Sequence, residues 1–469
     1  MFRVVGPFPK ASLSAGIVLA SVLFSSGLDS YPQTSPAQPL VRYMSFAEAK
    51  PTLEQYRQSN FSGSEIATEA EWNVWIRSQD TDVRSRIDDG VEDSISNFML
   101  YGTSFTKLPR LRGSEDALDS AGLLAPPATA RVGALARALR DSRPGERLEF
   151  IRHFLAKKGI GAAQFDDFLT ANLVRFAQDQ RAYEQKLQGA GKSCDPVEAM
   201  AVRGTLYEKR GLSVDTSLLP NFAIEETLRA MVNKGVLKQG SVRRIAIVGP
   251  GLDFTDKRDG YDFYPLQTIQ PFAILETVKR LNIADINGVQ VVTMDLNPAV
   301  NAHVAQLSAR ARKQQDYTMQ LPRDRNAAWS DAAVRYWKEF GSVLGTPVKP
   351  LLVPDALPGI ESRAVAIRAG YAVSITPIDL NIVAQTSDSP EGQGFDLIVA
   401  TNILVYYDVF QQALAMSNIA LLMNPSGFFV ANNALPAAHD SRLKYLGRKN
   451  VVFAKDSSYG DDVVVYQRQ

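Results

Sequence analysis

The sequence is poor in the residues that bind metals through sulfur or imidazole. It has one cysteine, Cys194, and three histidines among 469 residues. A single cysteine excludes an intrachain disulfide and cysteine-clustered zinc or iron–sulfur sites. His153, His303 and His439 are far apart and have no metal-ligand spacing. We therefore expect no metal site built on cysteine or histidine, although a carboxylate site for Mg²⁺ stays open.

The sequence also lacks an excess of charge of either sign. It has 51 Lys and Arg against 50 Asp and Glu, a formal net charge of +1, and no long basic run. We therefore expect no nucleic-acid partner and no general attraction to an anionic membrane. A hydrophobic fraction of 45% and a charged fraction of 22% are typical of a folded chain. At roughly 150 residues per domain, the length predicts two or three domains.

No apolar run reaches the roughly 20 residues that span a bilayer. The uncharged run Leu13–Phe24 follows Arg3 and Lys10 and precedes small residues, which is the pattern of a secretory signal peptide. The sequence predicts a signal-like segment over 1–27 and a Ser-, Pro- and Gln-rich linker over 28–44. We therefore expect the protein to be exported, or to associate with a membrane through this segment. The alternatives are an uncleaved apolar tail or a start codon assigned too early, which would leave a cytoplasmic protein.

The region 45–215 is predicted to be a mainly helical domain to which we assign no chemistry. Apolar residues recur there at i, i+3 and i+4, and the acidic stretch 88–93 is typical of a helix N-terminus. The predicted helices are 47–57, 69–77, 88–101, 130–139, 145–157 and 162–187.

From 216 to 469 strand-like and helix-like segments alternate, which predicts a doubly wound α/β sheet. The last two strands are joined by a short polar loop and read as a hairpin, so the final strand would run antiparallel to parallel neighbours. The predicted strands are 244–248, 288–294, 372–378, 395–400, 427–431, 450–454 and 462–467. The predicted helices are 222–236, 271–281, 299–313 and 408–423.

Glycines and acidic residues follow the predicted strands, where open α/β sheets bind ligands. Gly249 and Gly251 follow the first strand and allow a tight turn close to a ligand. Asp295 ends the second strand, where a carboxylate can accept both hydroxyls of a ribose. Asp379 ends the third strand, and Asn402 follows the fourth. Taken together, these strand ends favour a nucleoside site.

The region from about Pro220 to Gln469 resembles the class I S-adenosylmethionine-dependent methyltransferases, and most of all the chemotaxis-receptor methyltransferases. The run Thr-Asn-Ile-Leu-Val-Tyr-Tyr at 401–407 follows the R-N-V-L-I-Y-F run of that family closely. The stretch Asn-Pro-Ser-Gly-Phe-Phe-Val at 424–430 is similar to the family's turn into its fifth strand. The C-terminal hairpin resembles the family's closing antiparallel strand, which ordinary dinucleotide-binding domains lack.

The resemblance implies S-adenosylmethionine as cofactor and assigns roles to the strand-end residues. Gly249 and Gly251 would line its methionine part, together with Asp253, which stands where the family has a third glycine. Asp295 would bind the ribose, Asp379 the adenine, and Asn402 would lie beside the sulfonium.

The sequence departs from the family pattern at several places. Ile247 stands where the glycine loop usually begins with an acidic residue. Insertions at 254–270 and 314–370 are each predicted to be either a lid over the substrate or a packing element without a functional role. Tyr406 and Tyr407 could orient an acceptor or belong to the core. We name no catalytic base, and the glutamate substrate of the chemotaxis enzymes is not carried over.

Three functions are compatible with these patterns. The first is an active methyltransferase with an unidentified small-molecule or protein acceptor. The second is a non-catalytic binding or interaction module with the same fold, exported or membrane-associated. The third is a nicotinamide-dependent oxidoreductase, which the C-terminal hairpin and the missing G-x-G-x-x-G pattern disfavour.

Overall fold

The architecture was taken from a computed structural model. It describes residues 40–57, 65–113, 116–141, 145–190, 210–255, 261–285, 288–388, 393–432, 442–456 and 459–469. The predicted signal segment over 1–27, Cys194 and His439 lie outside these ranges. Contacts group residues 37–469 into one compact unit. Among the described helices, none combines the length and apolarity needed to cross a membrane.

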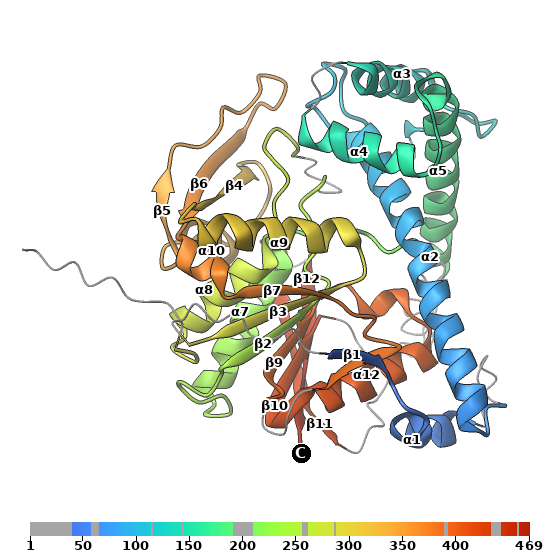
Figure 1. The fold of residues 1–469 in the computed structure, drawn as a ribbon. Coiled ribbons are helices and arrows are strands. Elements are labelled where there is room, and N and C mark those ends of the chain that lie inside the picture. The colour runs from blue at the N-terminus through green and yellow to red at the C-terminus, as the bar shows by residue number, and fades with distance from the viewer. Residues whose placement is uncertain are drawn as a thin grey trace, which may run out of the picture. The chain divides into compact units, whose positions relative to one another are not determined.

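A seven-stranded sheet forms the centre of the unit 37–469, in the order β11-β12-β10-β9-β2-β3-β7 (Figure 1). Neighbouring strands run parallel except β12, which is antiparallel to both β10 and β11. The doubly wound sheet with an antiparallel last strand is therefore confirmed. The bounds are β2 (Arg244–Val248), β3 (Gln290–Asp295), β7 (Ile375–Asp379), β9 (Phe395–Ala400), β10 (Met423–Ala431), β11 (Leu443–Val452) and β12 (Gly460–Arg468).

The central strands form because they are short apolar runs that the fold buries on both faces. On β2, Ile245 and Ile247 pack into one core, whereas Ala246 and Val248 pack into the core on the opposite face. The prediction of a strand over 372–378 was wrong in its first half. A short helix, α11 (Ala369–Val373), precedes β7 there, because Tyr371 and Ala372 are buried beside α9 rather than in the sheet.

Helices cover both faces of this sheet. The core that contains Ile245 and Ile247 includes residues of α7, α8, α9 and α10, and the core that contains Ala246 and Val248 includes residues of α1, α2 and α12. The N-terminal helices therefore complete the cover of one sheet face. The bounds are α1 (Phe46–Tyr56), α7 (Leu219–Asn233), α8 (Gln270–Arg280), α9 (Pro298–Arg312), α10 (Asp331–Glu339) and α12 (Val409–Leu422).

The helices predicted over 69–77 and 88–101 are one continuous helix, α2 (Glu69–Tyr101). The segment between them contains buried Asp80, Val83 and Ile87, which continue the stripe of Ile76. This spacing keeps one face of the helix buried through the acidic stretch 88–93. The prediction that a new helix begins at this stretch was therefore wrong. The second half of α2 forms a third core with α3 (Pro126–Arg140), α4 (Glu146–Lys157) and α5 (Phe165–Ala190).

Gly90, in the middle of α2, lies against the chain segment that enters the α/β part. A Cβ atom on Gly90 would lie 1.8 Å from the backbone oxygen of Leu212, so only glycine allows this approach. The backbone nitrogen of Leu212 also donates to the backbone oxygen of Arg86 at 3.0 Å. This close crossing fixes the position of the segment 212–217.

The insertion 314–370 forms a small antiparallel sheet of its own, in the order β4-β6-β5. Tyr336 and Trp337 on α10 are buried in the same core as α7 and α8, as the packing alternative predicted. A further two-stranded sheet joins β1 and β8, so residues 40–43, which we had placed in the linker, form a strand. The bounds are β1 (Leu40–Tyr43), β4 (Tyr317–Asp324), β5 (Gly345–Val348), β6 (Ile360–Ile367) and β8 (Gln385–Asp388).

Candidate functional site

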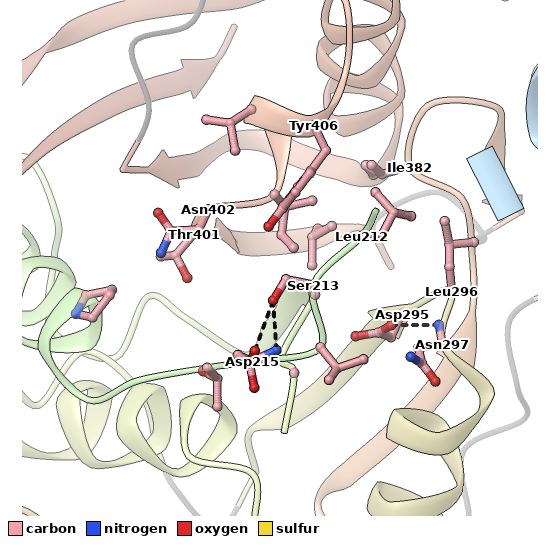
Figure 2. A pocket seen from close by; sticks show the side chains of 18 of the residues that line it. Leu212, Ser213, Asp215, Asp295, Leu296, Asn297, Ile382, Thr401, Asn402 and Tyr406 are labelled. Atoms are coloured by element: carbon pink, nitrogen blue, oxygen red, sulfur yellow. Dashed lines mark hydrogen bonds between the residues drawn. The ribbon is translucent and has the colours of Figure 1, made fainter. Parts of the chain in front are cut away.

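A cavity of about 700 Å³ lies at the carboxyl ends of β2, β3 and β9. Its walls also come from α2, α5, the segment 212–217 and the loop before β12, so distant parts of the chain meet there. Figure 2 shows the polar side chains of this cavity, which include Ser213, Asp215, Asp295, Asn297, Thr401, Asn402 and Tyr406.

The loop after β2 contains the two predicted glycines in left-handed conformations. Gly249 has φ of 66° and Gly251 has φ of 64°, a region that side chains disfavour. A Cβ atom on Gly249 would lie 2.1 Å from Cδ1 of Ile403, and one on Gly251 would lie 2.8 Å from the backbone oxygen of Val214. Glycine is therefore required at both positions, and both line the cavity.

Backbone hydrogen bonds attach the glycine loop to the segment 212–217. The nitrogen of Leu252 donates to the oxygen of Val214 at 2.7 Å, and the nitrogen of Thr216 donates to the oxygen of Leu252 at 3.0 Å. Because Gly90 fixes the start of this segment, α2 indirectly positions the glycine loop.

Asp295 ends β3 and lines the cavity beside the glycine loop. The backbone N–H of Asn297 donates to its Oδ1 at 2.8 Å, and the N–H groups of Gly251 and Leu296 also bond to the carboxylate. Burial nevertheless outweighs these donors and raises the pKa of Asp295 to about 6, and the nearby charge of Asp379 adds to the rise. The carboxylate is thus held rigidly and is only partly solvated.

Asn402 lies directly after β9, in the left-handed conformation with φ of 57°. Its backbone N–H donates to Oδ1 of Asn432 at 2.7 Å, and Nδ2 of Asn432 donates to its Oδ1 at 3.0 Å. The two asparagine side chains therefore hold this unfavourable backbone in place, with Asn402 at the cavity wall.

The structure does not bring the other two predicted residues, Asp253 and Asp379, into the cavity wall. Asp253 is buried and accepts from the hydroxyl of Tyr264 and from Nε2 of Gln267, both at 2.9 Å. Burial raises its pKa. Asp379 is half-exposed and pairs with Arg84 at 2.8 Å, while the next residue, Leu380, lines the cavity.

Sequence reasoning missed two acidic residues of the cavity, Asp215 and Asp461. Asp215 lies where the sequence changes texture from helical to α/β, and no motif marks it. Asp461 lies at the start of β12, in the polar loop that we interpreted only as a hairpin turn. Tyr406 and Tyr407 both line the cavity, and both are also buried, at 8% and 3% exposure.

No protein-family model matches this sequence, and no curated protein matches it. Solved structures with similar backbones include the N-methyltransferase NodS from Bradyrhizobium japonicum WM9 in complex with S-adenosyl-L-homocysteine, with 12% identity over 62% of this chain and 98% of that one, and a TM-score of 0.27. Magnesium protoporphyrin IX methyltransferase, ChlM, from Synechocystis PCC 6803 with bound SAM has 8% identity over 62% and 97%, with a TM-score of 0.26. MtNAS in complex with MTA and tNA has 10% identity over 76% and 91%, with a TM-score of 0.24.

In this chain β12 lies antiparallel between β10 and the edge strand β11, in an otherwise parallel sheet. By its own topology, the α/β part of this chain has the Rossmann-like methyltransferase fold with an antiparallel last strand.

Proposed function

We propose that this protein is an S-adenosylmethionine-dependent methyltransferase that binds its cofactor in the cavity at the ends of β2, β3 and β9. The observation that carries the proposal is the joint geometry of Gly251 and Asp295. The left-handed glycine donates its N–H to the carboxylate that ends the neighbouring strand. The glycine loop and Asp295 are thus held together at the carboxyl ends of the strands, which is where such folds bind nucleosides.

The residues present fit a nucleoside carrying an amino-acid tail. Asp295 offers a carboxylate for vicinal hydroxyls, and Leu296, Leu380 and Ile382 offer an apolar wall for a purine. Nδ2 of Asn297 is buried without a partner among the described residues, although Asn297 lines the cavity. A buried donor left unsatisfied costs about 1–3 kcal/mol, and a ligand acceptor would remove that cost.

The chain's own contribution to catalysis is placement and exclusion of water. The cofactor, when bound, supplies an activated methyl group. Asn402, held by Asn432, fixes the wall after β9, and the buried Tyr407 lines the same cavity. No described residue is assigned as a catalytic base of the proposed reaction.

Calorimetric titration of the full chain with S-adenosylhomocysteine, with NAD as the comparison ligand, tests the proposal. We expect binding near the micromolar range, about −8 kcal/mol, and none of comparable strength for NAD. Asp295→Asn is expected to weaken binding about 10- to 100-fold, since charge-assisted hydrogen bonds contribute about 1.5–3 kcal/mol.

Asp331→Asn serves as the matched control, because Asp331 lies on α10 with a 92% exposed side chain, outside the cavity wall. A folded protein that does not bind S-adenosylhomocysteine would contradict the proposal. Asp379→Asn tests the adenine role in the same titration: unchanged affinity would agree with its pairing to Arg84.

A further inference from the structure

The part of the cavity lined by the segment 212–217 and by the loop before β12 lies away from the predicted cofactor residues in sequence. Ser213 and Asp215 line it from one segment, Tyr459 and Asp461 from the other, and Tyr183 from α5. Figure 2 shows Tyr406 directed into this space from the wall that follows β9. A cavity of about 700 Å³ is within the range of about 300–1,000 Å³ for small-molecule sites, so the second ligand must be small.

The charged side chains that line the cavity are all acidic in the described part of the chain. Among the described residues that line it, the charged side chains are Asp215, Asp295 and Asp461, and there is no Lys, Arg or His. An anionic second ligand would therefore meet like charges from these described residues, and their repulsion disfavours its binding.

Asp461 is held so that it can accept a hydrogen bond from a ligand. Nδ2 of Asn432 donates to its Oδ2 at 3.1 Å, and the same nitrogen donates to Asn402, so Asp461 is tied to the wall after β9. No ion pair from the described residues reaches Asp461, and its Oδ1 has no hydrogen-bond donor among them. Burial raises the pKa of Asp461, although the bond from Asn432 lowers it.

Asp215 is fixed by neutral donors on three elements. The hydroxyl of Ser94 on α2 donates to its Oδ2 at 3.0 Å, and the backbone N–H of Thr255 donates to its Oδ1 at 3.2 Å. The hydroxyl of Ser213 also donates to Oδ2, at 3.4 Å. These donors orient the carboxylate at the cavity wall.

Building on the proposed function, we propose that the second ligand of the cavity is a small amine, held at Asp461 with Asp215 as the second carboxylate. A protonated amine has the charge that complements these carboxylates. Tyr183, Tyr406 and Tyr459 also line the cavity, and aromatic rings attract cations.

Ligand-observed saturation-transfer NMR on the full chain saturated with S-adenosylhomocysteine tests this proposal without relying on turnover. The probes are two matched sets that differ only in charge and nucleophile: benzylamine, benzyl alcohol and benzoate, and butylamine, butanol and butyrate. We expect the amines to bind at least fivefold more tightly than the alcohols and the carboxylates not to bind. Asp461→Asn is expected to remove this preference, and Asp215→Asn to reduce it.

Asp462→Asn is the matched control. Asp462 is the next residue on β12, lies outside the cavity wall, and accepts from Asn450 on the exposed side at 3.2 Å. Retained binding of S-adenosylhomocysteine shows that each variant is folded. Carboxylates or alcohols that bind as tightly as the amines, no amine binding at all, or an amine preference that survives Asp461→Asn would each overturn the proposal. Loss of S-adenosylhomocysteine binding in the unaltered chain would instead contradict the proposed function.

Discussion

The buried carboxyl group of Asp295, at the wall of the candidate site, lowers the stability of the fold at neutral pH. The pKa of its carboxyl group is about 6 in the folded protein, against an ordinary 3.8, because burial disfavours the charged form. Between about pH 4 and 6 the folded state therefore holds a proton that the unfolded state has released. The free energy of unfolding falls as pH rises through this window, and the penalty is fully present at neutral pH.

We predict that Asp295→Asn stabilises the ligand-free protein at pH 7 by about 1–3 kcal/mol, since the amide carries no charge to desolvate. Denaturant unfolding at pH 7 and at pH 4 measures this. The gain should shrink at pH 4, where the folded carboxyl group is protonated and the unfolded one is close to its ordinary pKa of 3.8. A variant that is equally or less stable at pH 7 would contradict it. The same variant is expected to bind S-adenosylhomocysteine less tightly.

Among the elements, α2 determines where the segment 212–217, which lines the cavity, lies. Its continuity was not predictable from the acidic stretch 88–93, because a local charge pattern typical of a helix start is also compatible with a helix interior. Asp80, Val83 and Ile87 are buried on the same helix face as Ile76, so the stretch belongs to the interior of one continuous helix. In contrast, β2 and β9 were predicted at their observed bounds, since their apolar runs have a polar or glycine boundary at each end.

We predict that Gly90→Ala destabilises the protein, although alanine is favoured over glycine in a helix by about 1 kcal/mol. The new methyl group would overlap the backbone oxygen of Leu212, so α2 and the segment 212–217 must separate. We expect a loss of more than about 1 kcal/mol in denaturant unfolding and weaker binding of S-adenosylhomocysteine.

Gly133→Ala in α3 provides the comparison for this element. A Cβ atom there meets nothing closer than the Arg137 side chain at 3.4 Å, so alanine should be neutral or stabilising. If Gly90→Ala behaved like Gly133→Ala, the close crossing would have no energetic importance.

For the whole molecule, the helical and α/β parts share one core. Met44, Trp72 and Ile76 pack in the same cluster as Ala246 and Val248 of the sheet. We predict that residues 216–469 expressed alone do not form a stable fold, because one face of the sheet would be exposed to water. Solubility and the cooperativity of thermal unfolding, compared with the full chain, measure this. A soluble fragment with a cooperative transition would contradict it.

Because the helical and α/β parts pack together, only part of the candidate site could be predicted from the sequence. The glycine loop, Asp295 and Asn402 follow strands directly, so strand prediction alone placed them together. Asp215 depends on the crossing of α2, which no local pattern shows. The closing hairpin was predicted, but the place of Asp461 at the cavity depends on where β12 joins the sheet. Asp379 has the predicted position but a different partner, because Arg84 comes from a helix about three hundred residues earlier in the chain.

The position of β12 also has a consequence for the order of events on the ribosome. This strand follows β10 and β11 in the chain but lies between them in the sheet. During translation β11 emerges before the strand that joins it to β10, so that side of the sheet stays open until residues 460–468 have been made. Asp461 belongs to the same strand, so the part of the cavity wall that it contributes forms only when β12 joins the sheet.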